Sequence, residues 1–189
     1  MMLELGFTVR PYPGERCSGD ATVVRHGDAV VLFGVIDALG HGEAAADAAD
    51  RAVAHLEAVS LRDSIGVIIG ALDVHLRGGR GAAALVCVAR GDALEGCGVG
   101  NVELRSIGMR VPVLGTPGIL GRGPAVRPRV FTTRLIQGAR LVLFSDGVSG
   151  RLRPDHRREL AAQAASAALL AQWGRDTDDA AVLVADVTG

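Results

Sequence analysis

The sequence contains no lysine: all 20 of its basic side chains are arginines. A Walker-type phosphate loop needs a lysine on the nucleotide phosphates, and a Schiff base needs a lysine amine, so both kinds of chemistry are excluded. The 21 acidic side chains leave a formal net charge of −1. Because nucleic-acid binding requires a clustered basic surplus, we expect no nucleic-acid partner.

Aromatic residues and cysteines are also scarce. Aromatics make up 3% of a chain that is 49% hydrophobic, so its core must be built from aliphatic side chains. The three cysteines, Cys17, Cys87 and Cys97, are odd in number and show no CxxC spacing, which argues against a disulfide framework and against a zinc site. A reducing compartment therefore fits best, with Cys87 and Cys97 as small core residues of apolar strands.

Long apolar runs and a basic N-terminal region are absent as well. No run approaches the ~20 residues of a membrane span, and the first nine residues carry Glu4 but no basic residue, unlike a signal peptide. We therefore expect a cytoplasmic, monomeric protein without a membrane partner. A length of 189 residues predicts a single domain spanning residues 1–189.

Hydrophobic periodicity predicts both strands and helices. Strands are expected at 3–10, 22–25, 29–36, 130–135, 140–144 and 180–187, with two more within 82–105, and helices at 42–59, 62–76 and 155–171. Pro154 is expected to open the third helix, and the glycine- and proline-rich segment 108–128 to form a loop. This order is neither a βαβ alternation nor an all-β array, so it predicts an α+β layered sandwich.

Acidic residues recur at sharp turns beside the predicted strands. They are Asp20 after Gly19, Asp37 after a buried strand, Asp146 in a Ser-Asp-Gly turn, and the doublet Asp178-Asp179 before the last strand. Carboxylates brought to one rim would repel each other unless a hard cation neutralised them. Oxygen-only ligands select Mg²⁺ or Mn²⁺ over zinc.

Each acidic position also has an ordinary structural explanation. Asp37, at the start of the string Asp37-Ala38-Leu39-Gly40-His41-Gly42, could be the N-cap of the following helix. Asp146 could belong to a common turn, and Asp178-Asp179 to the solvated mouth of a strand. For each position taken alone, these structural explanations are the more frequent ones.

In order and spacing together, the four positions resemble the metal-dependent protein phosphatases of type 2C, in the bacterial branch related to stage II sporulation protein E. The resemblance implies a four-layer α-β-β-α sandwich of two antiparallel sheets flanked by helices. It also implies that Asp37 bridges two Mn²⁺ or Mg²⁺ ions, that Asp146 and Asp178 complete the first site, and that Asp20 lies beside the second ion. The family's glycine after the bridging Asp is Ala38 here, which would offer its carbonyl to the second ion.

The segments around Arg80-Gly81-Ala82, Val99-Gly100-Asn101-Val102 and 115–123 resemble the RsbX-like stressosome phosphatases within that branch. This resemblance implies a protein-serine/threonine phosphatase acting on phosphorylated STAS-domain stressosome proteins of the RsbS and RsbR kind, through water activated by two metals. Arg80, His41, Asn101 and Asp179 are the candidate substrate-binding residues. Arg80 could equally be a solvated turn residue, and His41 a solvent-facing residue at the helix start.

Three other functions remain open on the sequence. A sporulation-type phosphatase would act on a phosphorylated anti-sigma-factor antagonist. A catalytically inactive phosphatase fold would only bind its partner, although all three acids expected at the first ion are present. A non-enzymatic α+β domain would carry its Asp turns by accident.

Overall fold

The computed structural model describes residues 1–189 and consists of three helices and ten strands. Their order is β1 (Met2–Arg10), β2 (Asp20–Gly27), β3 (Val30–Ala38), α1 (Glu43–Ala58), α2 (Ile65–His75), β4 (Ala82–Arg90), β5 (Ala93–Val99), β6 (Glu103–Ile107), β7 (Gly115–Thr116), β8 (Val130–Arg134), β9 (Arg140–Phe144), α3 (Ala162–Trp173) and β10 (Ala180–Thr188). None of the helices is long and apolar enough to cross a membrane.

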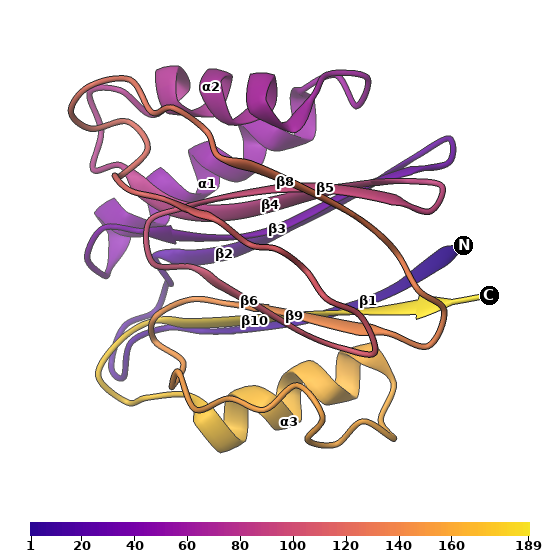
Figure 1. Cartoon of the computed structure of the whole chain (residues 1–189). Helices are drawn as coiled ribbons and strands as arrows, with labels where there is room; N and C mark the ends of the chain where they lie inside the picture. Colours follow the sequence, from indigo (N-terminus) through magenta and orange to yellow (C-terminus); the bar gives the residue numbers. More distant parts are fainter.

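The strands form two sheets that pack face to face, with helices on both outer faces (Figure 1). One sheet has the order β1-β10-β9-β6, and the other has the order β2-β3-β4-β5-β7, with β8 also paired to β5. All pairings are antiparallel except the short parallel pair of β5 with β7. The predicted four-layer α-β-β-α sandwich is confirmed.

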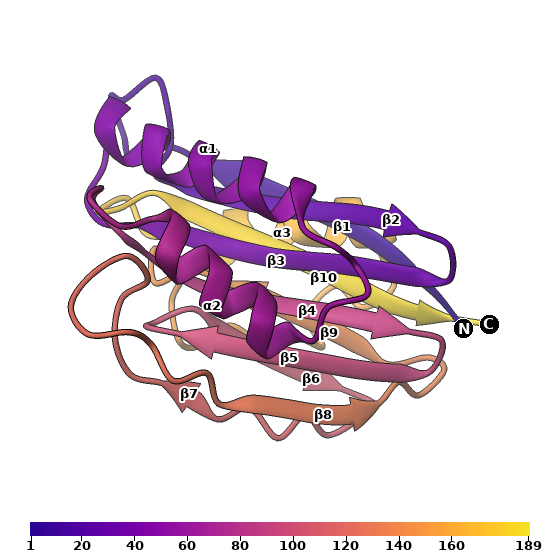
Figure 2. The same cartoon turned by 90° about the horizontal axis from the view of Figure 1, so that it is seen from above.

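Aliphatic side chains fill the three spaces between the four layers. α1 and α2 lie side by side over the larger sheet (Figure 2), and α3 covers the smaller one. The buried face of α1 consists of Ala45, Ala48, Ala49, Ala52 and Leu56, a spacing of three and four residues that puts them on one side of a helix. Small alanines let this helix approach the sheet closely. Cys87 and Cys97 lie buried in the strands, as expected.

The third helix is shorter than predicted, and this part of the prediction is wrong. It begins at Ala162, whereas 155–160 forms turns and Arg157 has a φ of 54° that no α-helix accommodates. The buried guanidinium of Arg140 donates hydrogen bonds to the carbonyls of Arg157 (3.2 Å) and Leu160 (2.7 Å). It also pairs with Asp186 at 2.7 Å. Tertiary contacts therefore override the local helical propensity of this segment.

The first strand fastens α3 to the sandwich. The helix begins after Ala161, which has no capping side chain, so Glu4 on β1 accepts a hydrogen bond from the amide of Ala162 at 3.2 Å. The side chain of Gln163 accepts from the amide of Phe7 and donates to its carbonyl, at 3.0 and 2.9 Å. A capping acceptor from another element thus satisfies one of the free amides at the helix start.

A second correction concerns the region after β4. The second of the two strands predicted within 82–105 is in the structure two separate strands, β5 and β6, which belong to different sheets. The turn at Gly100-Asn101, where Gly100 has a φ of 83°, carries the chain from one sheet to the other. The predicted loop 108–128 contains the two-residue strand β7, and Leu120 within it exchanges backbone hydrogen bonds with Ala82 at 3.1 and 2.9 Å.

Both ends of the chain lie together at one end of the sandwich (Figure 1). In the pairing of β1 with β10, Met2 lies opposite Thr188 at that end, and Arg10 lies opposite Ala180 at the other. Asp178 precedes Ala180 by two residues, so the predicted acidic positions belong to the end away from the termini.

Candidate active site

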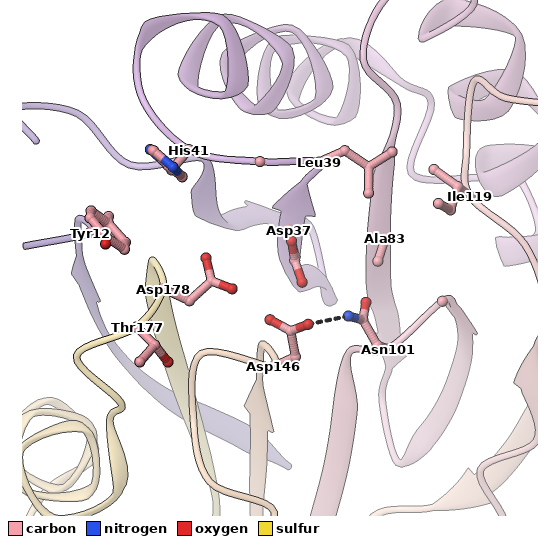
Figure 3. A pocket seen from close by; sticks show the side chains of 12 residues that line it. Tyr12, Asp37, Leu39, His41, Ala83, Asn101, Ile119, Asp146, Thr177 and Asp178 are labelled. Atoms are coloured by element: carbon pink, nitrogen blue, oxygen red, sulfur yellow. Dashed lines mark hydrogen bonds between the residues drawn. The ribbon is translucent and has the colours of Figure 1, made fainter.

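A cavity of about 710 Å³ opens at the end of the sandwich where the acidic turns gather. It is lined by Tyr12, Asp37, Leu39, Gly40, His41, Ala83, Gly100, Asn101, Ile119, Asp146, Thr177 and Asp178. Figure 3 shows the carboxylates of Asp37, Asp146 and Asp178 facing a common space at its centre. The structure therefore brings together the three acids that the sequence places far apart.

Asp37 is the next-to-last residue of the buried strand β3 and lies directly opposite Asp20, the first residue of β2. One carboxylate oxygen of Asp37, Oδ2, is buried and accepts no hydrogen bond. Burial, with the nearby charges of Asp146, Asp178 and Asp179, raises the pKa of Asp37 to about 7. The helix that follows is capped by Gly42 without a side-chain hydrogen bond, so Asp37 is not an N-cap.

Asp20, the cross-strand partner of Asp37, is only 5% exposed. The hydroxyl of Ser145 donates to its Oδ2. Burial and the charge of Asp37 raise the pKa of Asp20 to about 8, although the Ser145 hydrogen bond opposes this shift. Two neighbouring carboxyls are therefore both held in a site that disfavours negative charge.

Asp146 follows β9 in a turn that only glycine can complete. A Cβ at Gly147 would lie 1.7 Å from the carbonyl oxygen of Asp179, so any side chain there would push β10 away. The side-chain amide of Asn101 donates to Oδ2 of Asp146. Burial and Asp178 raise the pKa of the Asp146 carboxyl, whereas Arg175 and the Asn101 hydrogen bond lower it.

The acidic side chains of this site are better suited to binding a hard divalent cation than to pairing with any other group of the protein. As the side chains stand, no three His, Cys, Asp or Glu residues are close enough to hold a metal ion. The buried oxygen of Asp37 nevertheless has no donor, and the pKa values of Asp20, Asp37 and Asp146 are all raised. Unpartnered carboxylate oxygens beside a cavity are ligands of the kind that Mg²⁺ and Mn²⁺ select.

Ala38 lies between this acidic centre and the turn into α1. Its amide donates to the carbonyl of Gly19 at 2.9 Å, and its side chain is 2% exposed. Gly40 and Gly42 follow with φ angles of 85° and 76°, a left-handed backbone that glycine adopts without strain. The carbonyl ligand expected from Ala38 stays a prediction.

The four candidate substrate-binding residues have different surroundings. Asn101 and His41 line the cavity. His41 stacks on Tyr12 with 4.6 Å between ring centroids, and its Nδ1 lies 3.2 Å from a carboxylate oxygen of Glu15. Arg80 is exposed beside the cavity and donates to the carbonyl of Leu39 at 3.2 Å.

Asp179 does not line the cavity. It is 2% exposed, and its two oxygens accept from the amides of Tyr12 at 2.7 Å and Gly19 at 2.8 Å. The carboxylate therefore ties the segment before β2 to the start of β10. This arrangement is that of a structural group, and the substrate contact expected of Asp179 stays a prediction.

Sequence reasoning missed several residues of the site. Tyr12, Ile119 and Thr177 line the cavity from irregular segments that have no periodicity to reveal them. Arg175 donates to the backbone carbonyl of Asp146 at 3.3 Å, and its charge favours the ionised form of that acid. The only available signal was an arginine three residues before the Asp178-Asp179 doublet.

No protein-family model matches the chain, and no curated protein sequence matches it. A solved chain of the bacterial stressosome, described as a modular system adapted to control secondary messenger signaling, is 31% identical with a TM-score of 0.90. That alignment covers 98% of this chain and 100% of the other.

Two further solved structures share the fold. RsbX in complex with magnesium is 18% identical with a TM-score of 0.83, over 98% of this chain and 96% of RsbX. The PP2C phosphatase domain of SpoIIE from Bacillus subtilis, with a fragment of its regulatory domain, is 16% identical with a TM-score of 0.78, over 99% of this chain and 64% of the other. The chain belongs to the type 2C (PP2C) protein phosphatase family.

Proposed function

We propose that the protein is a metal-dependent protein-serine/threonine phosphatase. The observation that carries this proposal is the buried, unpartnered Oδ2 of Asp37, which faces a cavity shared with Asp146 and Asp178. Membership of the PP2C family supports it, because the same acids have matching positions in the family's motifs. A catalytically inactive phosphatase fold would have no need of three converging carboxylates beside an open cavity.

Two Mg²⁺ or Mn²⁺ ions would be held by Asp20, Asp37, Ala38, Asp146 and Asp178. Such ions supply charge neutralisation for the phosphate and an acidic water at neutral pH. RsbX, a structural neighbour, was solved in complex with magnesium. The raised pKa values of Asp20 and Asp37 imply that these carboxyls release protons when cations bind.

The reaction is hydrolysis of a phosphoserine or phosphothreonine ester. A water molecule loses one proton to the solvent and its oxygen forms a bond to phosphorus. The ester bond from phosphorus to the side-chain oxygen breaks, and that side-chain oxygen takes a proton. Asn101 orients the Asp146 carboxylate, and the Ser145 hydroxyl orients that of Asp20. His41 is held by Glu15 at Nδ1, which leaves Nε2 to deliver the proton to the leaving oxygen.

Phosphorylated STAS-domain stressosome proteins are the substrates that we infer. The 31% identity to a stressosome chain over the full length of both proteins supports this choice. The structural likeness to SpoIIE favours a second candidate, a phosphorylated anti-sigma-factor antagonist.

Phosphate release from purified phosphoproteins of both kinds tests the proposal. With Mn²⁺ or Mg²⁺ present, we expect release from the stressosome protein, none after chelation by EDTA, and a faster rate than with the antagonist. Asp146→Asn should abolish the release. Equal rates for wild type and Asp146→Asn, or no release from either phosphoprotein, would contradict the proposed function.

A further inference from the structure

Two arginines without acidic partners lie next to residues that line the cavity, each hydrogen-bonded to the backbone of one of them. Arg80 and Arg122 are exposed, and neither forms an ion pair with any carboxylate of the chain. They flank Gly81, because Arg80 precedes it and the Cγ of Arg122 lies 3.0 Å from the place of a Cβ there. We call this pair the arginine rim.

Arg80 is held against the wall of the cavity. Its Nη1 donates to the carbonyl of Leu39 at 3.2 Å, and Leu39 lines the cavity. The same Nη1 lies 2.7 Å from the place that a Cβ would take on Gly40, so the missing side chain leaves room for the guanidinium. One contact of this donor-rich group is to a backbone carbonyl, and its other donors stay available.

Arg122 is held by the backbone on both sides. Its amide donates to the carbonyl of Ile119, a lining residue of the cavity, at 3.2 Å. The preceding amide, of Gly121, donates at 2.9 Å to Asp73, a carboxylate of α2 that is 3% exposed. Because this loop is fixed to a buried helix residue, the backbone position of Arg122 is defined.

The opposite rim has a different charge. Tyr12 and His41 are stacked there, and Glu15 is paired with His41. Figure 3 shows His41 and Tyr12 on one side of the acidic centre, and Leu39 and Ile119 on the other. An acidic peptide that crosses the cavity is therefore attracted on the side of the arginine rim and not on the side of Glu15.

We propose that Arg80 and Arg122 form a docking surface for acidic side chains that flank the phosphorylated serine or threonine of a protein substrate. This inference rests on the proposed phosphatase function and adds the chemistry of the substrate segment. Guanidinium groups bind carboxylates through paired donors in a planar fork. A small phosphate ester, which has no flanking residues, makes no use of this surface.

Two synthetic phosphothreonine peptides test the docking surface. They share one sequence, except that one has aspartates and glutamates around the phosphothreonine and the other has asparagines and glutamines. With Mn²⁺ at low ionic strength, we expect kcat/KM of the wild type to be about three- to tenfold higher for the acidic peptide, the size that two exposed charge pairs supply. The difference should lie mainly in KM and shrink in high salt.

The double variant Arg80→Gln/Arg122→Gln should bring the ratio of the two kcat/KM values close to one. Arg62→Gln is the matched control, because Arg62 is also exposed and unpaired but lies in the segment between α1 and α2, and it forms no hydrogen bond to a residue that lines the cavity. It should retain the wild-type ratio. Thermal melting of all three proteins checks that the substitutions leave the fold intact.

Each outcome decides between the two proposals. A ratio of one in the wild type, a ratio unchanged in the double variant, or an equal loss in Arg62→Gln would overturn the docking surface while leaving the phosphatase function intact. If the wild type hydrolyses neither peptide nor any phosphoprotein, the proposed function itself is wrong and the docking surface falls with it.

Discussion

Asp37 and Asp179 are carboxylates at the same end of the sandwich, yet their surroundings are opposite. Asp179 accepts hydrogen bonds from two backbone amides, one on each oxygen. Asp37 has a buried oxygen with no donor and lies among Asp20, Asp146 and Asp178. The sequence gives no hint of this difference, because both residues adjoin an apolar strand: Asp37 lies near the end of β3, and Asp179 directly precedes β10.

The contrast shows what distinguishes a structural acid from the acid for which we propose metal binding. Burial alone does not, since Asp179 is the more buried of the two. What differs is the supply of donors: a carboxylate with a donor for each oxygen stabilises the fold, whereas a buried carboxylate oxygen that lacks a donor carries a desolvation cost. Substitutions at the two positions should therefore have opposite effects on stability.

Asp37→Asn should have the largest effect, on activity. Metal ions stabilise transition-state charge by several kcal/mol, and about 1.4 kcal/mol corresponds to a factor of ten, so we expect kcat/KM to fall on the order of 10³-fold. The melting temperature of the metal-free variant should rise, by roughly 2–4 °C for each kcal/mol of repulsion removed. Phosphopeptide hydrolysis and calorimetry in EDTA measure the two effects. If the melting temperature of metal-free Asp37→Asn were lower than that of the wild type, Asp37 would stabilise the fold as Asp179 does, and the contrast between the two acids would not hold.

Asp179→Ala should have the next largest effect, on stability. It leaves the amides of Tyr12 and Gly19 without their acceptor, and losing two hydrogen bonds to a charged group costs about 3 kcal/mol or more. The melting temperature should fall by roughly 6–12 °C. Asp179→Asn keeps one good acceptor, so we expect an intermediate loss in the free energy of unfolding measured by urea titration. If neither variant loses stability, the hydrogen bonds that Asp179 accepts from the amides of Tyr12 and Gly19 do not stabilise the fold.

A third effect is a pH dependence of the metal-free protein. The folded-state pKa of Asp37, about 7, and that of Asp20, about 8, lie above the ordinary value of 3.8. The folded protein therefore holds more protons than the unfolded one between these values, so stability is fully present below about pH 4 and declines as pH rises towards 7 to 8. Urea titrations in EDTA from pH 5 to 8 measure the slope. Asp37→Asn should flatten it, and an unchanged slope would contradict the assignment to this pair.

The sequence was sufficient to predict the fold class and to single out the acids that meet at the cavity, whose metal binding stays a prediction. Strand ends can be recognised by apolar runs, and an acid at such an end must lie at a rim, as Asp37 and Asp146 do. Their convergence could be expected only through the family resemblance, because Asp37 and Asp146 are 109 positions apart in the sequence.

Other features could not be predicted because contacts distant in sequence determine them. The third helix starts late because Arg140 takes the carbonyls of Arg157 and Leu160. The structural role of Asp179 depends on amides 167 and 160 positions away. Asp73 looks like an ordinary acid of a helix, yet it fixes the loop that carries Arg122.

The pairing of Met2 with Thr188 has a practical consequence for handling the protein. Strands rise about 3.3 Å per residue, so the eight steps from Ala180 to Thr188 carry the chain roughly 26 Å from the acidic end. A bead, a surface or a fused partner attached through a short linker at either end of these 189 residues leaves the cavity pointing outward. Under the proposed phosphatase function, immobilised protein should therefore act even on large protein complexes that are passed over it.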